Sequence, residues 1–193
     1  GKNILLAITG GVAAYKSAEL CREFKRAGAE VRVVMTKSAQ EFITPLTLQA
    51  LSGQTVHSEL LDPESEAGMG HIELAKWPDL IVVAPATANF IAKYANGLAD
   101  DLLSTLLLAT TSPLAIAPAM NQAMWKNPLT QRNIEELTKC FGKNFIVLGP
   151  EAGEQACGDI GPGRMMEPVA IFQGVVEYFS LPDERSLANK VVV

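Results

Sequence analysis

The sequence predicts an α/β fold in which a doubly wound parallel sheet lies between two layers of helices. Continuous apolar runs alternate with helical patterns along the chain, and no internal repeat is present. Hydrophobic residues make up 48% of the chain and charged residues only 19%, as expected when both faces of a sheet are buried. The length of 193 residues suits one domain with a single core.

Short apolar runs predict the strands Asn3–Ile8, Glu30–Met35, Leu80–Ala84, Leu114–Ala117 and Phe145–Leu148. Helical patterns separate them, namely residues 12 to 27 closed by Gly28, Ser38–Ser52 with a break at Pro45, Asp101–Thr110 and Asn127–Cys140. This alternation implies right-handed crossovers between parallel strands. We therefore expect a three-layer sandwich of the flavodoxin or Rossmann type.

Two segments do not follow this alternation. The stretch Glu151–Met166 is rich in glycine and shows no periodicity, so it is either a lid over a site or a loose surface connection. Residues 181–193 are polar and then end in three valines, which is typical of a linker that enters a following domain. We expect one domain over residues 1–180.

The composition excludes several functional classes. The net charge is −5 without a basic run, so nucleic acid is not an expected partner. Three cysteines without CxxC spacing predict neither disulfides nor zinc and indicate a reducing, cytoplasmic location; Cys21 and Cys140 fall on predicted helices and are expected in the core. The apolar stretch Leu102–Met120 contains Pro113 and Pro118, so no membrane span is expected, and no signal peptide is visible.

Ligands of open parallel sheets bind beyond the carboxyl ends of the strands. The first strand is followed by Gly10 and Gly11, whose backbone could approach an anion at a helix start, although a bare glycine turn is weak evidence. The second strand is followed by Thr36, Lys37 and Ser38, where an NAD enzyme would carry an acidic residue for the ribose. These groups suit a phosphate and favour a mononucleotide such as FMN.

Five more candidate residues lie just after strands or in and after the glycine-rich loops. Thr87 and Asn89 could face a flat ring, although Thr87 could equally be a helix N-cap. Asn121 follows the fourth strand and has the same two interpretations. His71 starts a predicted helix after a loop, where an imidazole could act as a base or be structural. Cys157 lies in the glycine-rich stretch, where a packing role is least expected.

Five motifs occur in order along the chain: GGVAAYK, GHIELAKW, APATANFIAKYANGLADDLL, PAMNQAMW and ACGDIGPGRM. Together they resemble the flavin-dependent cysteine decarboxylases, most specifically the phosphopantothenoylcysteine (PPC) decarboxylases of coenzyme A biosynthesis, from Lys2 to about Ser180. The resemblance implies an FMN enzyme that converts 4′-phosphopantothenoylcysteine to 4′-phosphopantetheine. It also implies trimers with the site near subunit contacts and, in bacteria, fusion to a CTP-using PPC synthetase.

The resemblance also assigns roles to residues of this sequence. It implies that the catalytic residues are His71, Asn121 and Cys157. The implied FMN contacts are Gly10, Gly11, Val12, Thr36, Ser38, Ala86, Thr87, Ala88 and Asn89. The implied substrate contacts are Asn121, Met120, Gly161 and Arg164, and no metal ligands are expected.

The implied reaction begins when FMN oxidises the CH2–SH arm of the substrate to a thioaldehyde. The carboxylate is then β to the C=S bond, so loss of CO2 gives an enethiolate, and return of the hydride with a proton from Cys157 gives the saturated thiol. On this view Asn121 presents its amide to the substrate carboxylate or amide, and the neighbouring methionines and tryptophan exclude water.

Four alternatives compete with this function. Lantibiotic-type peptidyl-cysteine decarboxylases stop at the enethiol, and Cys157 argues against them. Flavin prenyltransferases share the fold, but His71 and Asn121 favour decarboxylation. Halotolerance-type phosphatase-binding relatives carry long acidic tails, which this sequence lacks. A generic NAD(P) oxidoreductase is disfavoured by Thr36 and Ser38.

Overall fold

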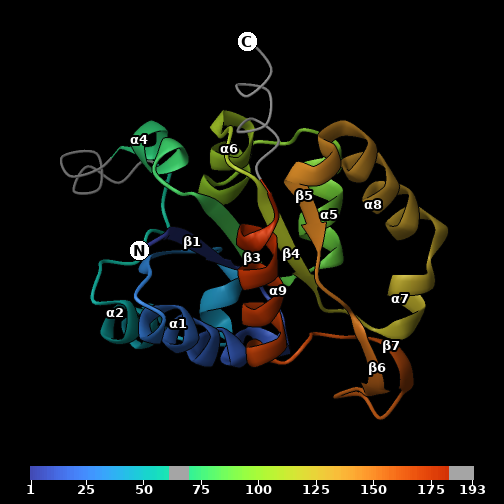
Figure 1. Cartoon of the computed structure of the whole chain (residues 1–193). Helices are drawn as coiled ribbons and strands as arrows, with labels where there is room; N and C mark the ends of the chain where they lie inside the picture. Colours follow the sequence, from blue (N-terminus) through green and yellow to red (C-terminus); the bar gives the residue numbers. More distant parts are fainter. Residues whose placement is uncertain (61–69, 183–193) are drawn as a thin grey trace.

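The computed structural model describes residues 1–60 and 70–182. Its centre is a five-stranded parallel sheet with the strand order β2-β1-β3-β4-β5 (Figure 1). The strands are β1 (Asn3–Ile8), β2 (Glu30–Met35), β3 (Leu80–Ala86), β4 (Leu114–Pro118) and β5 (Phe145–Val147). The order reverses between β1 and β3, which places the switch point of the sheet there.

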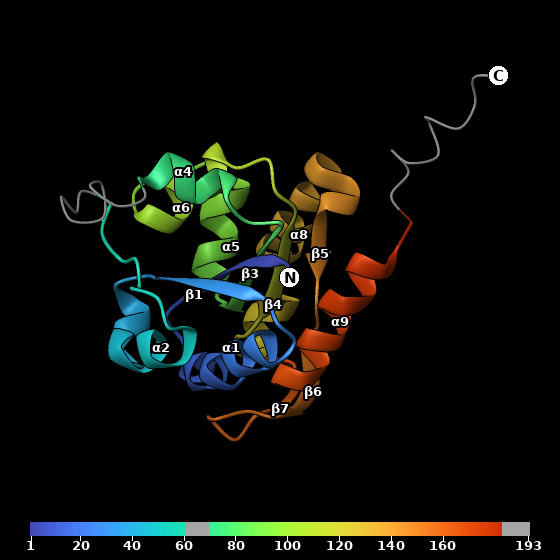
Figure 2. The same cartoon turned by 60° about the vertical axis from the view of Figure 1, so that its left-hand side comes forward.

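Helices cover both faces of the sheet, as the two views in Figures 1 and 2 show. One face carries α1 (Lys16–Arg26), α2 (Pro45–Ser52) and α9 (Pro168–Ser180). The opposite face carries α4 (His71–Lys76), α5 (Ala88–Ala95), α6 (Leu102–Ala109) and α8 (Pro128–Phe141). The short helix α7 (Gln122–Lys126) follows β4. Short 3₁₀ turns are found at Val12–Tyr15, Ser38–Glu41 and Gly142–Asn144.

The alternation of side chains along the central strands explains their continuous apolar sequences. In β1, Leu6 packs into the cluster under α1, while Leu5 packs into the cluster under α5 and α6, because successive side chains of a strand point to opposite faces. Every residue of β3 is buried. The predicted doubly wound sheet with two helical layers is therefore confirmed.

The glycine-rich stretch is the main difference from the sequence-based expectation. It forms an antiparallel hairpin of β6 (Glu151–Glu154) and β7 (Ile160–Arg164) that lies beside α7. The interpretation as a loose surface connection is therefore wrong. Small residues oppose each other in this hairpin, as Gly153 and Gly161 do, so no apolar alternation marked it as a pair of strands.

The cysteines divide differently from the prediction. Cys21 is fully buried, and burial raises the pKa of its thiol to about 11. Cys140, expected in the core, is exposed, because it lies in the last turn of α8, beyond the buried residues Thr130, Asn133 and Leu137 of that helix. Cys157 is exposed in the hairpin turn.

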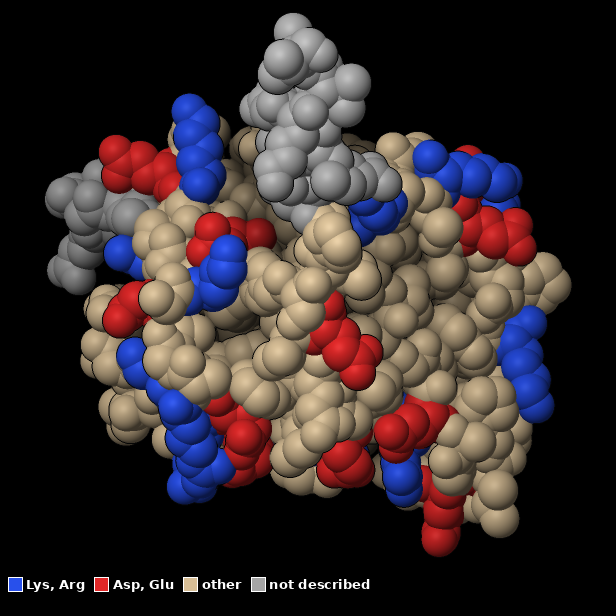
Figure 3. Space-filling model, viewed as in Figure 1, with Lys and Arg blue, Asp and Glu red and all other residues tan. Residues whose placement is uncertain are grey.

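The surface shows mixed charge. On the face seen in Figure 3, acidic and basic side chains are interspersed, without a basic stripe. Among residues 1–60 and 70–182, none of the helices has both the length and the apolar character that crossing a membrane would require. The expected linker and following domain, residues 181–193, lie almost wholly outside the described residues.

Candidate functional site

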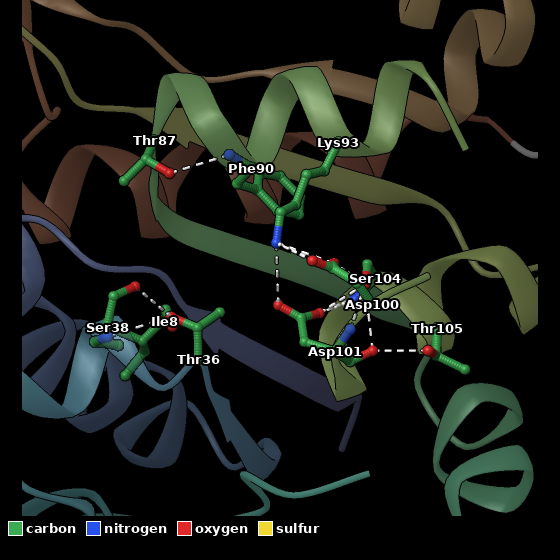
Figure 4. A network of polar contacts seen from close by, with 11 residues as sticks. Ile8, Thr36, Ser38, Thr87, Phe90, Lys93, Asp100, Asp101, Ser104 and Thr105 are labelled. Atoms are coloured by element: carbon green, nitrogen blue, oxygen red, sulfur yellow. Dashed lines mark hydrogen bonds and ion pairs between the residues drawn. The ribbon is translucent and has the colours of Figure 1, made fainter. Parts of the chain in front are cut away.

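A cavity of about 620 Å³ opens at the carboxyl edge of β1, β2 and β3. This size is within the range of small-molecule sites, which is roughly 300–1,000 Å³. The predicted contacts Thr36, Ser38, Thr87 and Asn89 all line it. The close view in Figure 4 shows Thr36 and Ser38 on one wall and Thr87 on another. The structure therefore brings the rim segments after β2 and β3 to one cavity.

The turn after β1 depends on a glycine because it packs against the turn after β2. A Cβ on Gly10 would lie 2.5 Å from Ser38 Cβ and 2.9 Å from the carbonyl carbon of Ser38, closer than non-bonded carbons approach. A Cβ on Gly11 would meet only a methyl group of Thr87, at 3.8 Å. The Gly10–Gly11 turn is therefore inserted between the other two rim segments.

Threonine hydroxyls hold the backbone of the rim, both between the segments after β1 and β3 and within the segment after β2. The buried Thr9 hydroxyl donates to the Pro85 carbonyl at 2.6 Å and accepts the Thr87 N–H at 3.2 Å. On the next segment, Thr36 Oγ1 accepts the Ala39 N–H at 3.2 Å and lies 3.2 Å from the Ser38 hydroxyl. The rim is thus held before any ligand binds.

The far wall of the cavity is formed by α5 and the start of α6. Lys93 Nζ lies 2.9 Å from both carboxylate oxygens of Asp100, which raises the pKa of Lys93 and lowers the pKa of Asp100. Asp101 accepts the Ser104 N–H at 2.7 Å and caps α6 in a capping box. Sequence reasoning did not select this wall; the Asp-x-x-Ser cap before an apolar run was the available signal.

The remaining predicted FMN contacts lie at or outside the edge of this cavity. Gly10 and Gly11 adjoin it through Ser38 and Thr87. Ala86 is buried at the end of β3, and Thr87 also caps α5 by accepting the Phe90 N–H at 3.2 Å. Val12 is 60% exposed and, with Ala88, is outside the cavity lining. Thr87 is therefore the N-cap of α5 and also lines the cavity, while its contact to a flat ring stays a prediction.

A second cluster forms where the hairpin meets α7. Asn121 is the N-cap of α7, since its Oδ1 accepts the Ala123 N–H at 2.8 Å. Its Nδ2 lies 3.6 Å from the sulfur of Cys157 and donates to Asp159 Oδ2 at 2.7 Å. Two of the three predicted catalytic residues are thus together, although they are far apart in sequence.

Backbone contacts on both sides of Asn121 dock the hairpin. The Met120 N–H donates to the Gly163 carbonyl at 2.9 Å. The Gln122 N–H donates to Gln155 Oε1 at 3.1 Å. A Cβ on Gly163 would lie 2.6 Å from the Gln155 amide nitrogen. The hairpin can approach this closely because its inner residues are glycines.

Three further predictions concern this cluster. Gly161 touches it, because a Cβ there would lie 2.8 Å from the amide carbon of Gln122. Arg164 pairs with Glu151 at 3.5 Å across the hairpin. The expected exclusion of water by the methionines and the tryptophan is not met by Met124 and Trp125 within one protomer: Met124 is 49% exposed and α7 buries none of its residues, although β7 and α8 lie against this helix. Met120 is partly buried and packs against the core.

His71 is not close to this cluster within one protomer. It is the first residue of α4, after the N-cap Gly70, and is half-buried. Helix α4 packs against α6, and both views separate it from β6 and β7. The structure therefore brings Asn121 to Cys157 but leaves His71 elsewhere. Within the described ranges, no group of three or more His, Cys, Asp or Glu side chains could hold a metal ion.

Comparison with known proteins identifies the family to which this chain belongs. Residues 1–180 match the model of the family described as Flavoprotein. The chain is 59% identical over 179 residues to the coenzyme A biosynthesis bifunctional protein CoaBC of Vibrio vulnificus, which covers 93% of this chain and 44% of that protein. The chain thus spans less than half the length of the curated relatives that it matches.

Two solved structures are similar over almost their whole length. One is a Cys→Ser variant of a PPC decarboxylase in complex with pantothenoylaminoethenethiol, with a TM-score of 0.80 and 37% identity, covering 93% of this chain and 99% of that one. The other is the FMN-binding protein AtHal3, with a TM-score of 0.77 and 38% identity, covering 94% and 99%. The chain therefore belongs to the Flavoprotein family, in the group of the flavin-dependent cysteine decarboxylases.

Proposed function

We propose that the chain decarboxylates 4′-phosphopantothenoylcysteine to 4′-phosphopantetheine with FMN as its cofactor. The observation that carries the proposal is the cluster in which the Asn121 amide lies 3.6 Å from the Cys157 thiol at the rim of a parallel sheet. An amide donor and a thiol proton donor are the two groups needed near a cysteine carboxylate that leaves as CO2. The similarity to a PPC decarboxylase and to an FMN-binding protein supports it.

The rim cavity fits FMN. Thr36, Lys37 and Ser38 offer two hydroxyls and an ammonium group for a phosphate. Thr87 and Asn89 offer dipoles for ring heteroatoms, and the small Gly10–Gly11 turn lets a flat ring lie near the backbone. No acidic residue stands directly after β2, where a dinucleotide ribose would require one.

His71, Asn121 and Cys157 then have separate roles in proton transfer and in binding the substrate carboxylate. FMN held by the cavity would supply the hydride acceptor for the carbon next to sulfur and the hydride donor for the return step. His71 accepts the proton of the substrate thiol as the hydride leaves, which gives the thioaldehyde. Asn121 donates to the substrate carboxylate and holds it until the C–C bond breaks. Cys157 donates a proton to the carbon of the enethiolate as the hydride returns, which gives the saturated thiolate, and the proton held by His71 returns to the sulfur to give the thiol.

The separation of His71 from Asn121 supports an oligomeric site. Since α4 and the hairpin are apart in one protomer, we place His71 of one subunit beside Asn121 of another, in a homotrimer. Exposed apolar side chains are available for such contacts, including Val12, Tyr15 and Ile72. The same proposal includes a decarboxylase domain over residues 1–180, a linker over 181–193 and a cytoplasmic location. It also includes a fused synthetase domain, which the greater length of the curated relatives supports.

A peptidyl-cysteine decarboxylase that stops at the enethiol is the second candidate. It needs no proton donor for a reductive half-reaction, so the position of Cys157 beside Asn121 disfavours it.

One assay separates these functions. The FMN-loaded protein is mixed with 4′-phosphopantothenoylcysteine, and CO2 and the thiol product are followed by mass spectrometry. The proposal expects CO2 and saturated 4′-phosphopantetheine in equal amounts. Accumulation of the enethiol alone would favour the peptidyl type, and absence of both products would contradict decarboxylation of this substrate.

A further inference from the structure

Asp159 occupies the side of Asn121 that a substrate carboxylate would need. The Asn121 oxygen is committed to the cap of α7, where it accepts the Ala123 N–H at 2.8 Å. Only the two N–H groups of the amide are left for an incoming anion, and the amide nitrogen also donates to the Cys157 sulfur at 3.6 Å. That nitrogen donates to Asp159 Oδ2 at 2.7 Å, which is the short distance typical of a charge-assisted hydrogen bond.

The hairpin turn presents Asp159 to Asn121. The Gln155 N–H donates to the Asp159 carbonyl at 2.8 Å, and the Gly158 N–H donates to the Gln155 carbonyl at 2.8 Å. Gly158 has a φ of 86°, which closes the turn. The Asp159 side chain is exposed and forms no ion pair with any described residue. The Asn121 amide is thus its principal partner in this part of the chain.

The contact can be broken without releasing the hairpin. Docking depends on the Met120–Gly163 backbone bond and on the Gln122–Gln155 bond, and neither uses the Asp159 side chain. Two carboxylates on one amide group would lie within a few ångströms of each other, where like charges repel even in water. An incoming carboxylate must therefore displace Asp159, whereas a ligand without a carboxylate leaves the contact intact.

We propose that Asp159 is a specificity-determining residue that stands in for the substrate carboxylate on Asn121. It occupies the amide when the site is empty, yields it to the carboxylate of the substrate, and returns once that group has left as CO2. This inference rests on the proposed function, because it takes Asn121 as the carboxylate-binding group. It predicts that Asp159 weakens the binding of carboxylate ligands and leaves decarboxylated ligands unaffected.

Two unreactive probes test this inference. 4′-Phosphopantothenoyl-alanine carries the carboxylate but has no sulfur to oxidise, and 4′-phosphopantothenoyl-ethylamine is its decarboxylated counterpart. Calorimetry gives the affinity of both probes for the FMN-loaded wild type, Asp159→Ala and Asp159→Asn. Glu154→Gln is the matched control, since it removes one negative charge from an exposed position of the same hairpin.

The expected result is a change in the ratio of the two affinities. Asp159→Ala binds the alanine probe about three- to tenfold more tightly than the wild type, the range for loss of one exposed competing hydrogen bond. Asp159→Asn lies between, because a neutral amide competes less strongly. The ethylamine probe is unaffected, and Glu154→Gln leaves both affinities unchanged.

Other outcomes overturn the inference. Weaker or unchanged binding of the alanine probe to both Asp159 variants would mean that Asp159 does not compete for Asn121. An equal gain in Glu154→Gln would reduce the effect to general charge. Turnover of 4′-phosphopantothenoylcysteine by the wild type tests the proposed function separately. Turnover with an unchanged ratio removes only this inference, and absence of turnover removes both.

Discussion

Replacing Gly10 with alanine tests how the cavity is built. The new Cβ would lie 2.5 Å from Ser38 Cβ and 2.9 Å from the Ser38 carbonyl carbon. The second of these is a backbone atom, so a side-chain rotation of Ser38 cannot relieve the overlap. Overpacking of this kind costs about 1–3 kcal/mol. For a chain of this size, that corresponds to a decrease of roughly 2–12 °C in the Tm of the apoprotein.

Gly11→Ala is the matched control for this experiment. Its Cβ would make only an ordinary contact with Thr87, at 3.8 Å, and the backbone φ of Gly11 is extended. We expect the Tm of apo Gly11→Ala to stay near the wild-type value. Both proteins are unfolded thermally without flavin and then titrated with FMN, with flavin fluorescence as the signal. Gly10→Ala should lose FMN affinity about ten- to a hundredfold, since the strain is released by moving the rim.

Two results would refute this reasoning. One is an apo Gly10→Ala protein whose Tm is unchanged, because the close approach to Ser38 would then not be real. The other is an equal loss of apoprotein stability in Gly11→Ala, because the effect would then come from loss of glycine in the turn and not from the contact with Ser38.

Further predictions concern Asn121 and the cysteines. Asn121→Asp should be nearly inactive. The activity of Asn121→Ala should fall roughly ten- to a hundredfold, because the substrate carboxylate loses a hydrogen bond worth about 1.5–3 kcal/mol. Wild-type kinetics for the aspartate variant would exclude an amide that faces the substrate. Cys157→Ser should release CO2 once but accumulate the enethiol, since a hydroxyl is a much weaker acid than a thiol, and normal yields of saturated product would assign the proton elsewhere. In the native protein, iodoacetamide should modify Cys140 and Cys157 but not the buried Cys21, as peptide mapping would show. Burial raises the pKa of Cys21 from 9.0 to about 11, so between these pH values the folded form keeps a proton that the unfolded chain releases. The contribution of Cys21 to the free energy of unfolding is therefore full below pH 9 and falls by about 2 kcal/mol up to pH 11. Cys21→Ala should lose this part of the pH dependence, and an unchanged dependence of the unfolding free energy on pH, measured by urea unfolding, would contradict it.

The fold was largely predictable because local patterns and packing agree. Buried runs such as Leu80–Ala84 are typical of central parallel strands, and the glycines after β1 allow the close approach to Ser38 that the structure shows. The hairpin was not predictable, since its pairing depends on glycines such as Gly153 and Gly161 and on docking against α7. The exposure of Cys140 has a related reason, because helical periodicity does not say how far along a helix its inner side stays covered, and Cys140 lies in the last turn of α8.

The site was predictable by residue type but not by arrangement. Asn121 was recognised as both a cap and a site candidate, and its oxygen caps α7 while its nitrogen meets the hairpin. Asp159 lies in the motif ACGDIGPGRM, but no local pattern marks it as a site residue, since only the folded turn brings it to Asn121. The separation of His71 from Asn121 and Asp159 likewise depends on the fold of the whole protomer, and no local sequence pattern indicates it.

Subunit complementation tests most directly the central claim, that PPC decarboxylation uses His71 of one subunit and Asn121 of another. His71→Asn and Asn121→Asp should each bind FMN and be inactive as pure oligomers. When the two variants carry different tags, are co-expressed and are purified through both tags, sites that combine the two intact residues form again. Each mixed trimer then contains one intact site out of three, which predicts about a third of the wild-type rate of 4′-phosphopantetheine formation. Mixed oligomers that are no more active than either parent would contradict the claim.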